Sequence, residues 1–274
     1  MKKILAVLLT LTLLTQLFGC RKVSFDESKG ELVIGLECEY APFNWTETEN
    51  TSSNVEIYGQ RGLYAEGYDI EMAKLIAQEL GLRLVVKKIA WDGLIPALES
   101  GEIDAIIAGM SPTSKRKESI NFSNPYYETQ HVVVVKKDGP YANATRFTDF
   151  SNANIVGQRG TSYETLAEQL AQKAGTTANP PLATVPLIIS GILVGDNDVT
   201  VIEKPVALGV CASNPGLKYI ELLDQFEVDE EERVVSIGLR KVDTNLLNLI
   251  NDALAKISAE TRESLMVSAI ESGE

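Results

Sequence analysis

The chain has 274 residues, of which 45% are hydrophobic and 23% charged, and this composition is typical of a globular protein with one large core or two medium ones. A formal net charge of −13 argues against nucleic acid and anionic lipid surfaces as partners. Three cysteines and one histidine, without metal-ligand spacing, argue against a bound metal, and we expect no cofactor.

The N-terminal segment has the pattern of a secretory signal. Two lysines precede an apolar run over residues 4–18, which is too short to span a bilayer comfortably and ends at a glycine and Cys20. Cys20 resembles the lipidated cysteine of a lipobox, although Phe18 departs from the small residue usual there. We predict a signal peptide over residues 1–19 and a lipidated tether over residues 20–30, which holds the mature protein outside the cytoplasm. Ordinary secretion and an uncleaved anchor are the alternatives.

Strand and helix patterns alternate after residue 31. Short apolar runs predict strands, and apolar residues repeating every three or four positions predict helices. Asp69 is expected to cap the first helix, and its charge, with that of Glu71, to complement the helix dipole rather than to act in catalysis. This βαβ order predicts a mostly parallel sheet covered by helices. The expected elements are strands at 32–36, 82–89 and 104–108, helices at 69–80 and 92–100, and an extended loop or hairpin over 44–67.

A second α/β series begins near residue 138. Residues 161–164 have the spacing of a capping box at the start of a helix. Cys38 and Cys211 lack the spacing of a disulfide framework, so we expect free thiols, with a bridge as the alternative. His131 precedes four valines and is expected to be structural. The expected elements are strands at 155–158, 199–202 and 234–239, a helix beginning at 161 and a final helix at 245–260.

Polar groups follow several of the predicted strands. Gly109 and Ser111 follow one strand, residues 158–162 follow another, and Glu203 ends a third. In open parallel sheets, ligands bind at the carboxyl ends of strands, where backbone N–H groups can meet an anion. Arg116 adds a planar donor suited to a carboxylate, and Glu203 supplies the opposite charge. Such a site suits a zwitterion, for example a free amino acid.

At this point the chain resembles the bacterial extracellular solute-binding proteins of family 3, which serve amino-acid ABC uptake systems. The most specific part is GYDIEMAKLIAQEL at residues 67–80, which fits the family signature at every fixed position. The supporting runs are YAPF at 40–43, WDGLIPAL at 91–98, AGMSPTSKR at 108–116, FSNPYY at 122–127 and IEKPVA at 202–207.

The resemblance implies an α/β protein with the type II periplasmic binding protein fold. Two α/β lobes are joined by two hinge strands, near 132–136 and 233–239, with a ligand cleft between them. Hinge closure requires few crossing segments. We expect lobe 1 to comprise residues 31–133 and 238–274, and lobe 2 to comprise residues 134–237.

The resemblance also implies a role for each candidate ligand-binding residue. Arg116 would pair with the ligand α-carboxylate, and the carbonyl of Gly109 and the carboxylate of Glu203 would accept from the α-ammonium. The family usually has Asp where this chain has Glu203, which is one methylene longer. The remaining roles are help with the carboxylate from Ser111, Thr161 and Ser162, aromatic walls from Trp91 and Tyr40, and polar side-chain contacts from Glu37 and Gln158.

The same residues allow plainer interpretations. Arg116 can lie on a solvated helix face, Trp91 and Tyr40 in an ordinary core, Glu203 in a surface turn and Glu37 in solvent. The predicted function is nonetheless an amino-acid receptor that presents its ligand to ABC permease subunits, as a monomer and without enzymatic activity. A cationic ligand such as arginine, lysine or histidine is favoured, because Glu37 lies beside an aromatic wall. A receptor for glutamine or another polar amino acid, a sensory binding protein and a dehydratase-like enzyme on the same fold are the alternatives.

Overall fold

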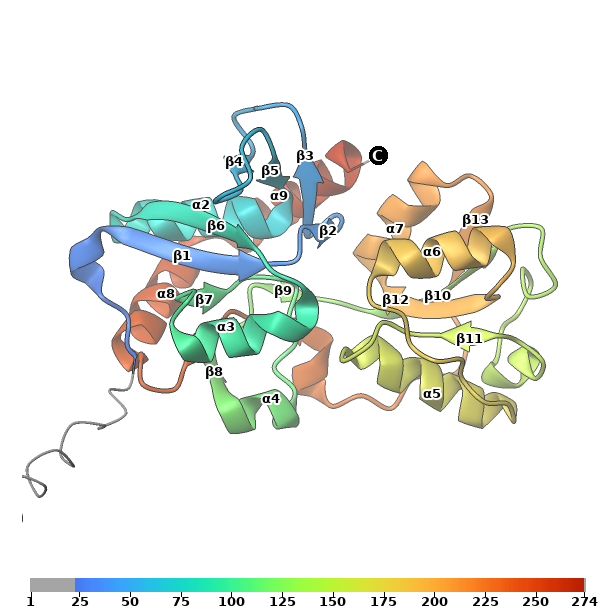
Figure 1. The fold of residues 1–274 in the computed structure, drawn as a ribbon. Coiled ribbons are helices and arrows are strands. Elements are labelled where there is room, and N and C mark those ends of the chain that lie inside the picture. The colour runs from blue at the N-terminus through green and yellow to red at the C-terminus, as the bar shows by residue number, and fades with distance from the viewer. Residues whose placement is uncertain (1–22, 274) are drawn as a thin grey trace, which may run out of the picture.

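The structure is a computed structural model that describes residues 23–273 of the chain. Two α/β lobes lie side by side (Figure 1). The predicted signal peptide and Cys20 lie outside the described residues, which begin within the predicted tether. Among the residues that are described, no helix is both long and apolar enough to cross a membrane.

The sheet of lobe 1 has the strand order β6-β1-β7-β15-β8. β6, β1 and β7 are parallel, as the alternation of strands and helices predicts, whereas β15 runs antiparallel to both of its neighbours. Helices α2 and α8 pack against each other, and α3 packs against β1 and β7. The elements are β1 Glu31–Leu36, α2 Tyr68–Leu80, β6 Arg83–Lys88, α3 Leu94–Ser100, β7 Ala105–Ile106, α4 Ser114–Ser119, β8 Ile120–Phe122, β15 Gly238–Arg240, α8 Thr244–Lys256 and α9 Ala259–Ser272.

Residues 44–67, expected as an extended loop or hairpin, form strands of a small antiparallel sheet. Its order is β2-β3-β5-β4, in which β5 pairs antiparallel with both β3 and β4. The sheet lies beside β1 and α2 at one edge of lobe 1 (Figure 1). Its strands are β2 Glu39–Tyr40, β3 Asn44–Glu47, β4 Val55–Glu56 and β5 Tyr64–Glu66.

The sheet of lobe 2 has the order β11-β12-β10-β13, in which β10 is antiparallel to both neighbours and β11 is parallel to β12. Helices α6 and α7 were missed by the sequence prediction. Both carry a proline in the first turn, where it is tolerated. The elements are β10 His131–Lys136, β11 Ile155–Val156, α5 Ser162–Ala174, α6 Val185–Val194, β12 Val199–Glu203, α7 Lys204–Ser213 and β13 Leu217–Ile220.

The chain crosses between the lobes where β9 (Tyr127–Glu128) pairs antiparallel with β14 (Val234–Val235). The amide of Thr129 also donates to the carbonyl of Arg233 at 2.8 Å. All of β10 pairs within the second sheet, so the expected boundary between residues 133 and 134 falls inside a strand. The first crossing precedes the valine run, and the strand expected at 234–239 is divided into β14 and β15.

Two helix boundaries differ from expectation. The final helix predicted over 245–260 is two helices, α8 and α9, because the Ser258 hydroxyl accepts from the amide of Thr261 and begins a new helix. Asp69 does not cap α2, since the N-cap is Gly67 at φ +122°. Asp69 is instead fully buried, while Glu71 pairs with Lys74 at 2.7 Å.

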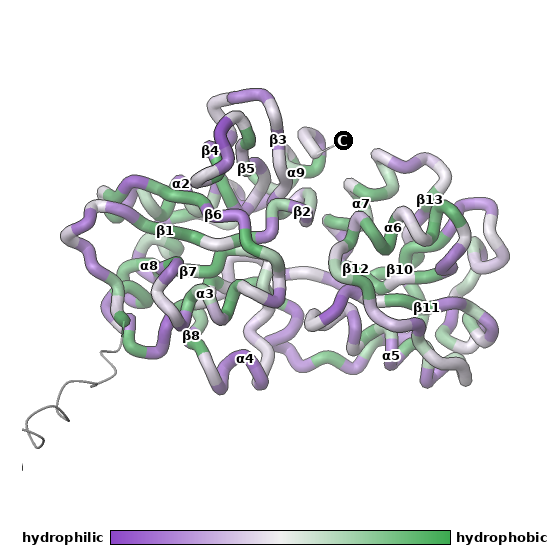
Figure 2. The backbone as a smooth tube through the Cα atoms, viewed as in Figure 1, coloured by the Kyte–Doolittle hydropathy of each residue, from purple (hydrophilic) through white to green (hydrophobic). Residues whose placement is uncertain are grey.

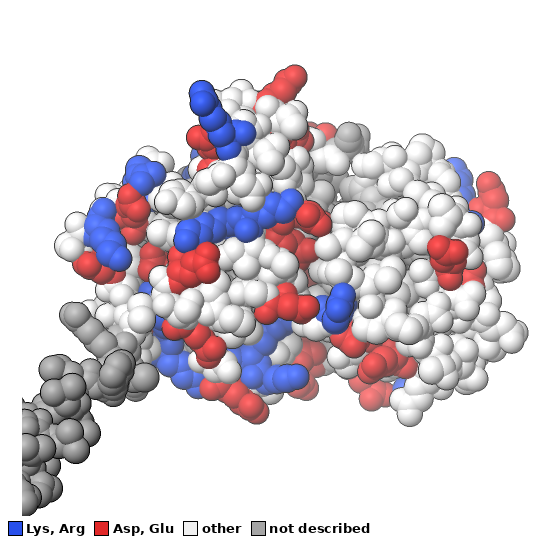
Figure 3. Space-filling model, viewed as in Figure 1, with Lys and Arg blue, Asp and Glu red and all other residues white. Residues whose placement is uncertain are grey.

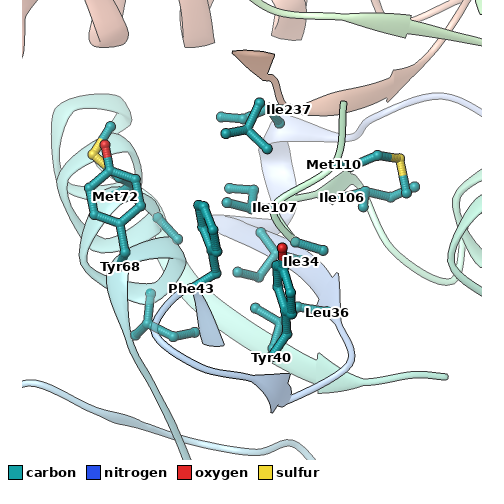
Figure 4. Packing of buried hydrophobic residues seen from close by; sticks show 14 of the residues in the cluster. Ile34, Leu36, Tyr40, Phe43, Tyr68, Met72, Ile106, Ile107, Met110 and Ile237 are labelled. Carbon is teal, nitrogen blue, oxygen red and sulfur yellow. The ribbon is translucent and has the colours of Figure 1, made fainter. Parts of the chain in front are cut away.

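Hydrophobic residues concentrate along the strands of both lobes (Figure 2). The core of lobe 1 reaches the pocket between the lobes through a group of aromatic rings. Tyr40 stacks on Phe43 with centroids 5.2 Å apart, and Phe43 meets Tyr68 edge-on at 6.1 Å (Figure 4). Cys38, in this core, and half-buried Cys211 are both free thiols, as expected.

Candidate functional site

One pocket between the lobes brings together every candidate ligand-binding residue of the sequence analysis. Lobe 1 contributes its lining from the carboxyl ends of β1 and β7 and from α4, and lobe 2 from the start of α5 and the end of β12. The free cavity is about 20 Å³, roughly the room of one water, because the lining side chains bond to one another. The lining residues are Glu37, Tyr40, Trp91, Gly109, Ser111, Arg116, Gln158, Thr161, Ser162, Tyr163 and Glu203.

Glycine is required at the end of the β7 segment. Gly109 has φ +59°, and a Cβ there would approach Cε1 of Tyr40 to 2.7 Å. The chain then turns into α4, where the Thr113 hydroxyl accepts from the amide of Arg116. This turn brings Arg116 back toward the strand end, and its Nη1 donates to the carbonyl of Ser111 at 2.8 Å.

Arg116 is half-buried and spans the lobes. Its Nη2 donates to the carbonyl of Gly160 at 3.2 Å, and the guanidinium lies 5.0 Å from the ring centroid of Trp91. Burial lowers the pKa of Arg116 to about 10, so the side chain stays charged at neutral pH. The indole of Trp91 donates to the same Gly160 carbonyl at 3.1 Å. Neither the solvated-helix interpretation of Arg116 nor the core interpretation of Trp91 therefore fits.

The start of α5 supplies backbone N–H groups on the lobe 2 side. Thr161 is the N-cap, and its hydroxyl accepts from the amide of Tyr163 at 3.1 Å and donates to the carbonyl of Gln158 at 2.7 Å. The predicted capping box is shifted by one residue, because the Glu164 carboxylate accepts from Gly160 rather than from Thr161. A helix N-terminus carries partial positive charge and favours an anion.

Glu203 ends β12 and is 2% exposed, so it is not in a surface turn. Its Oε2 accepts from the Tyr40 hydroxyl at 2.5 Å, and its amide donates to the Tyr163 hydroxyl at 3.3 Å. The two tyrosine hydroxyls also bond to each other across the lobes. Burial raises the pKa of Glu203 to about 7, although the tyrosine hydrogen bonds and Arg116 oppose the shift.

Glu37 follows β1 and is 6% exposed, which excludes the solvated interpretation. Gln158 Nε2 donates to both oxygens of Glu37, at 3.3 and 3.4 Å, and to the carbonyl of Ala183 at 3.2 Å. Burial raises the pKa of Glu37 to about 7, and the bond from Gln158 lowers it. A second buried carboxyl group thus lies in the pocket, held across the lobes by an uncharged amide.

Tyr163 was missed as a lining residue. Its position in the apolar pattern of α5 predicts a core residue, and the ring is 3% exposed, but its hydroxyl reaches the pocket. His131 packs edge-on against this ring at 6.2 Å, and burial and the charge of Arg233 lower the pKa of His131 to about 4. Within residues 23–273, no cluster of side chains could hold a metal ion.

The chain matches a known protein family over most of its length. The model of the bacterial extracellular solute-binding proteins, family 3, matches residues 32–266. The chain belongs to this family. The family 3 chain is 27% identical over 259 residues to the arginine-binding extracellular protein ArtP of Bacillus subtilis, covering 94% of this chain and 93% of ArtP.

Solved structures agree with the type II periplasmic binding protein fold expected for this family 3 protein. The amino acid ABC transporter substrate-binding protein AbpA of Streptococcus pneumoniae, bound to L-arginine, superposes with a TM-score of 0.76 at 27% identity, covering 90% of this chain and 97% of AbpA. The ancestral amino acid-binding protein AncCDT-1, a precursor of cyclohexadienyl dehydratase, superposes with a TM-score of 0.72 at 25% identity, covering 89% and 96%.

Proposed function

We propose that this family 3 protein is the extracytoplasmic receptor of an amino-acid ABC uptake system, with a cationic amino acid as its ligand. Lipidation of Cys20 would hold the protein at the membrane, and the closed form would be presented to permease subunits. The observation that carries the proposal is that one pocket between the lobes is lined by groups of both signs. Arg116 and the start of α5 line it together with the carboxyl groups of Glu37 and Glu203.

The ligand α-carboxylate is assigned to the basic end of the pocket. Arg116 already donates to the carbonyls of Ser111 and Gly160, so its guanidinium is aimed into the space between the lobes. A carboxylate there would replace these neutral acceptors with a charged one, which the planar guanidinium can bind through two parallel N–H···O bonds. Thr161 and Ser162 open α5 beside it and offer hydroxyl and backbone donors.

The α-ammonium is assigned to Glu203 and the carbonyl of Gly109. An ammonium that replaced the Tyr40 hydroxyl as donor to Glu203 would stabilise the ionised carboxylate against its burial. The extra methylene of glutamate, compared with the usual aspartate, brings its oxygens to the tyrosine hydroxyls. Tyr40 and Tyr163 would then complete the ammonium site.

The ligand side chain is assigned to Glu37, Gln158 and Trp91. A ligand guanidinium or ammonium that reached Glu37 would pair with the buried carboxylate as an opposite charge. The Gln158 amide bonds to this carboxylate but is uncharged, so it does not compensate the charge of Glu37. ArtP is an arginine-binding protein, and AbpA was solved with bound L-arginine. Both relatives support a cationic ligand. Glutamine is the alternative ligand, because the Gln158 amide offers hydrogen bonds without charge.

Ligand entry requires the lobes to separate, since the lining groups bond to one another across the pocket. The contacts to be broken are Gln158 to Glu37, Arg116 to Gly160, and Tyr40 to Glu203. The short pairing of β9 with β14 is the place where such a motion can bend with few crossing bonds.

A dehydratase is the second candidate function, favoured by one observation. Glu203 has a pKa of about 7 and could move a proton at neutral pH. The resemblance to AncCDT-1, a precursor of such an enzyme, gives the same alternative. A binding site that pairs both charges of a zwitterion explains these residues without any catalytic reaction. A sensory receptor is a further alternative, which would use the same site.

A thermal-shift screen tests these functions. The mature chain, unfolded and refolded to remove bound ligand, is heated with each of the twenty amino acids, ornithine and citrulline. A ligand at a hundredfold excess over its Kd adds about 2.7 kcal/mol of apparent stability. Shifts confined to arginine, lysine, histidine or ornithine support the cationic receptor, and shifts for neutral amino acids discard that selectivity. No shift with any of them contradicts the receptor, and an assay for dehydration of cyclohexadienyl acids then tests the enzyme.

A further inference from the structure

The carboxylate of Asp69 is fully buried but does not line the pocket. It lies in the first turn of α2, where Oδ2 accepts from Asn44 Nδ2 at 2.8 Å and Oδ1 accepts from the Tyr126 hydroxyl at 2.6 Å. These two donors come from β3 and from the segment before β9, which are far from Asp69 in the chain. Each donor makes a second bond that leads toward the ligand pocket.

The first branch reaches the loop that carries Glu37 and Tyr40. Asn44 Oδ1 accepts from the amide of Cys38 at 2.8 Å. Cys38 has φ +54°, a left-handed conformation that residues with a side chain seldom adopt. The bond that the Cys38 amide donates to Asn44 holds this turn, and the turn sets the directions of the lining residues Glu37 and Tyr40 on either side of it.

The second branch reaches the loop of Gly109 and Ser111. The Tyr126 hydroxyl accepts from the amide of Gly109 at 3.2 Å while it donates to Asp69. The backbone N–H of Gly109 fixes this direction, because it can only donate, and the hydroxyl hydrogen of Tyr126 is then left to point at Asp69. The Gly109 amide is therefore held, and so is the strand end that leads to the Ser111 carbonyl beneath Arg116.

A carboxylate suits this position better than any neutral group of the same size. An asparagine would turn an NH₂ group toward either Asn44 or Tyr126, both of which donate to Asp69. Glu71, in the same turn of α2, has no such connection and pairs with Lys74 instead. Glu71 has the same charge in the same helical turn, so these two properties do not explain the role of Asp69. The bonds from Asn44 and Tyr126 do explain it.

We propose that Asp69 is a positioning residue that holds the two lobe 1 loops of the ligand pocket through Asn44 and Tyr126. Its effect on ligand affinity rests on the proposed amino-acid receptor function, but its effect on the loops does not. The proposal makes separate predictions for the two branches, because each branch ends on a different backbone amide.

Amide hydrogen exchange tests the branches without any ligand. We expect Tyr126→Phe to speed exchange at Gly109 and leave Cys38 unchanged, and Asn44→Ala to do the reverse. Asp69→Asn should speed both, and the matched control Glu71→Gln should speed neither. Tyr126→Phe keeps the test decisive if Asp69→Asn fails to fold. Unchanged exchange at Gly109 in folded Tyr126→Phe protein overturns the proposal.

Calorimetric titration with arginine tests the consequence for binding, at a temperature where circular dichroism shows each variant to be folded. We expect Asp69→Asn to weaken arginine binding about tenfold or more, and Glu71→Gln to leave it unchanged. Tyr126→Phe should weaken arginine and glutamine binding alike. It acts through Gly109 on the part of the pocket proposed to bind the α-amino and α-carboxyl groups, which all amino acids share. Asn44→Ala should change their ratio.

The two kinds of failure are distinguishable. If Asp69→Asn lowers Tm while the Kd of the folded protein is unchanged, Asp69 only stabilises lobe 1 and the positioning role is overturned. If the wild-type protein binds no amino acid, the proposed function fails, and the exchange pattern at Cys38 and Gly109 alone decides whether Asp69 holds the loops.

Discussion

The two lobes hold their halves of the pocket by different means. Lobe 1 buries charge: Arg240 donates to Asp243 at 2.6 Å, to Asp104 at 3.0 Å and to the carbonyl of Leu98 at 3.1 Å, and Asp69 forms a second buried network. In the described part of lobe 2, the ion pairs all involve exposed side chains. Charged groups crowd the lobe 1 side of the view in Figure 3, whereas the lobe 2 side is mostly uncharged.

This difference indicates how each half of the pocket is specified. In lobe 1, side-chain networks fix loops whose backbone is otherwise unusual, as at Cys38 and Gly109. In lobe 2, the positions follow from short-range contacts at the start of α5, where the Thr161 hydroxyl and the Glu164 carboxylate hold the turn at Gly160. Polar substitutions away from the pocket should therefore change binding more when they lie in lobe 1.

The largest effect is expected at Arg240. Replacing it with methionine leaves Asp104 and Asp243 buried without their partner and should lower the free energy of unfolding by about 3 to 5 kcal/mol. Lys173→Met, which breaks the exposed pair with Glu227 in lobe 2, should cost less than about 1 kcal/mol. Urea unfolding measures both, and equal losses would remove the contrast between the lobes.

The next effect is on ligand binding at Arg116. Arg116→Ala should weaken binding of every amino-acid ligand by more than about 2 kcal/mol, because the α-carboxylate loses a half-buried charged donor. The neighbouring cation Lys115 is exposed, and Lys115→Ala is the matched control. A calorimetric loss smaller than this for Arg116→Ala would return the side chain to a structural role.

A smaller effect is expected at Glu37, and it depends on the ligand. Glu37→Gln removes the charge but keeps the shape, so arginine and lysine affinity should fall about tenfold while glutamine affinity is retained. Glu39→Gln, at an exposed acid paired with Lys88, is the control. Unchanged arginine and lysine titrations in Glu37→Gln would show that the selector lies elsewhere.

The smallest effect is on the pH dependence of stability. Glu37, Asp69 and Glu203 have pKa values raised to about 7 in the folded protein, above their ordinary values, and His131, lowered to about 4, opposes only one of these three groups. The folded state therefore holds more protons between about pH 4.5 and 7. Unfolding free energy without ligand should therefore fall as pH rises through this window. Glu203→Gln should reduce the fall, and the exposed Glu221→Gln should not. Parallel pH profiles for wild type and Glu203→Gln would contradict the assignment.

Short-range patterns predicted much of the fold and the lining of the pocket. The apolar runs of β1 and β6 and the periodicity of α2 and α5 are local properties, and the family motifs located strand-end residues that share one pocket. The break between α8 and α9 depends on a single hydroxyl at Ser258 and was missed. A regular apolar pattern does not reveal such a cap.

Hydrogen-bond partners that lie far apart in the chain could not be predicted from the sequence. Asp69 was assigned to the helix dipole because its neighbours suggested a cap, yet its partners are Asn44 and Tyr126. Tyr163 was assigned to the core because of its position in the apolar pattern of α5, and only the packing of α5 against β12 shows its hydroxyl at Glu203. Whether the lining residues contact ligand stays a prediction.

The attachment of Phe25 bears on how the receptor would move. Its amide donates to Asp243 at 2.8 Å, and Asp243 is itself bound to Arg240, so the first described residues are attached to the buried ion cluster of lobe 1. A lipid at Cys20 would therefore restrain lobe 1, and lobe 2 would swing as the free arm. Lobe 1, whose loops are fixed by side-chain networks, would stay stationary relative to the membrane. Lobe 2 would move when a ligand is captured.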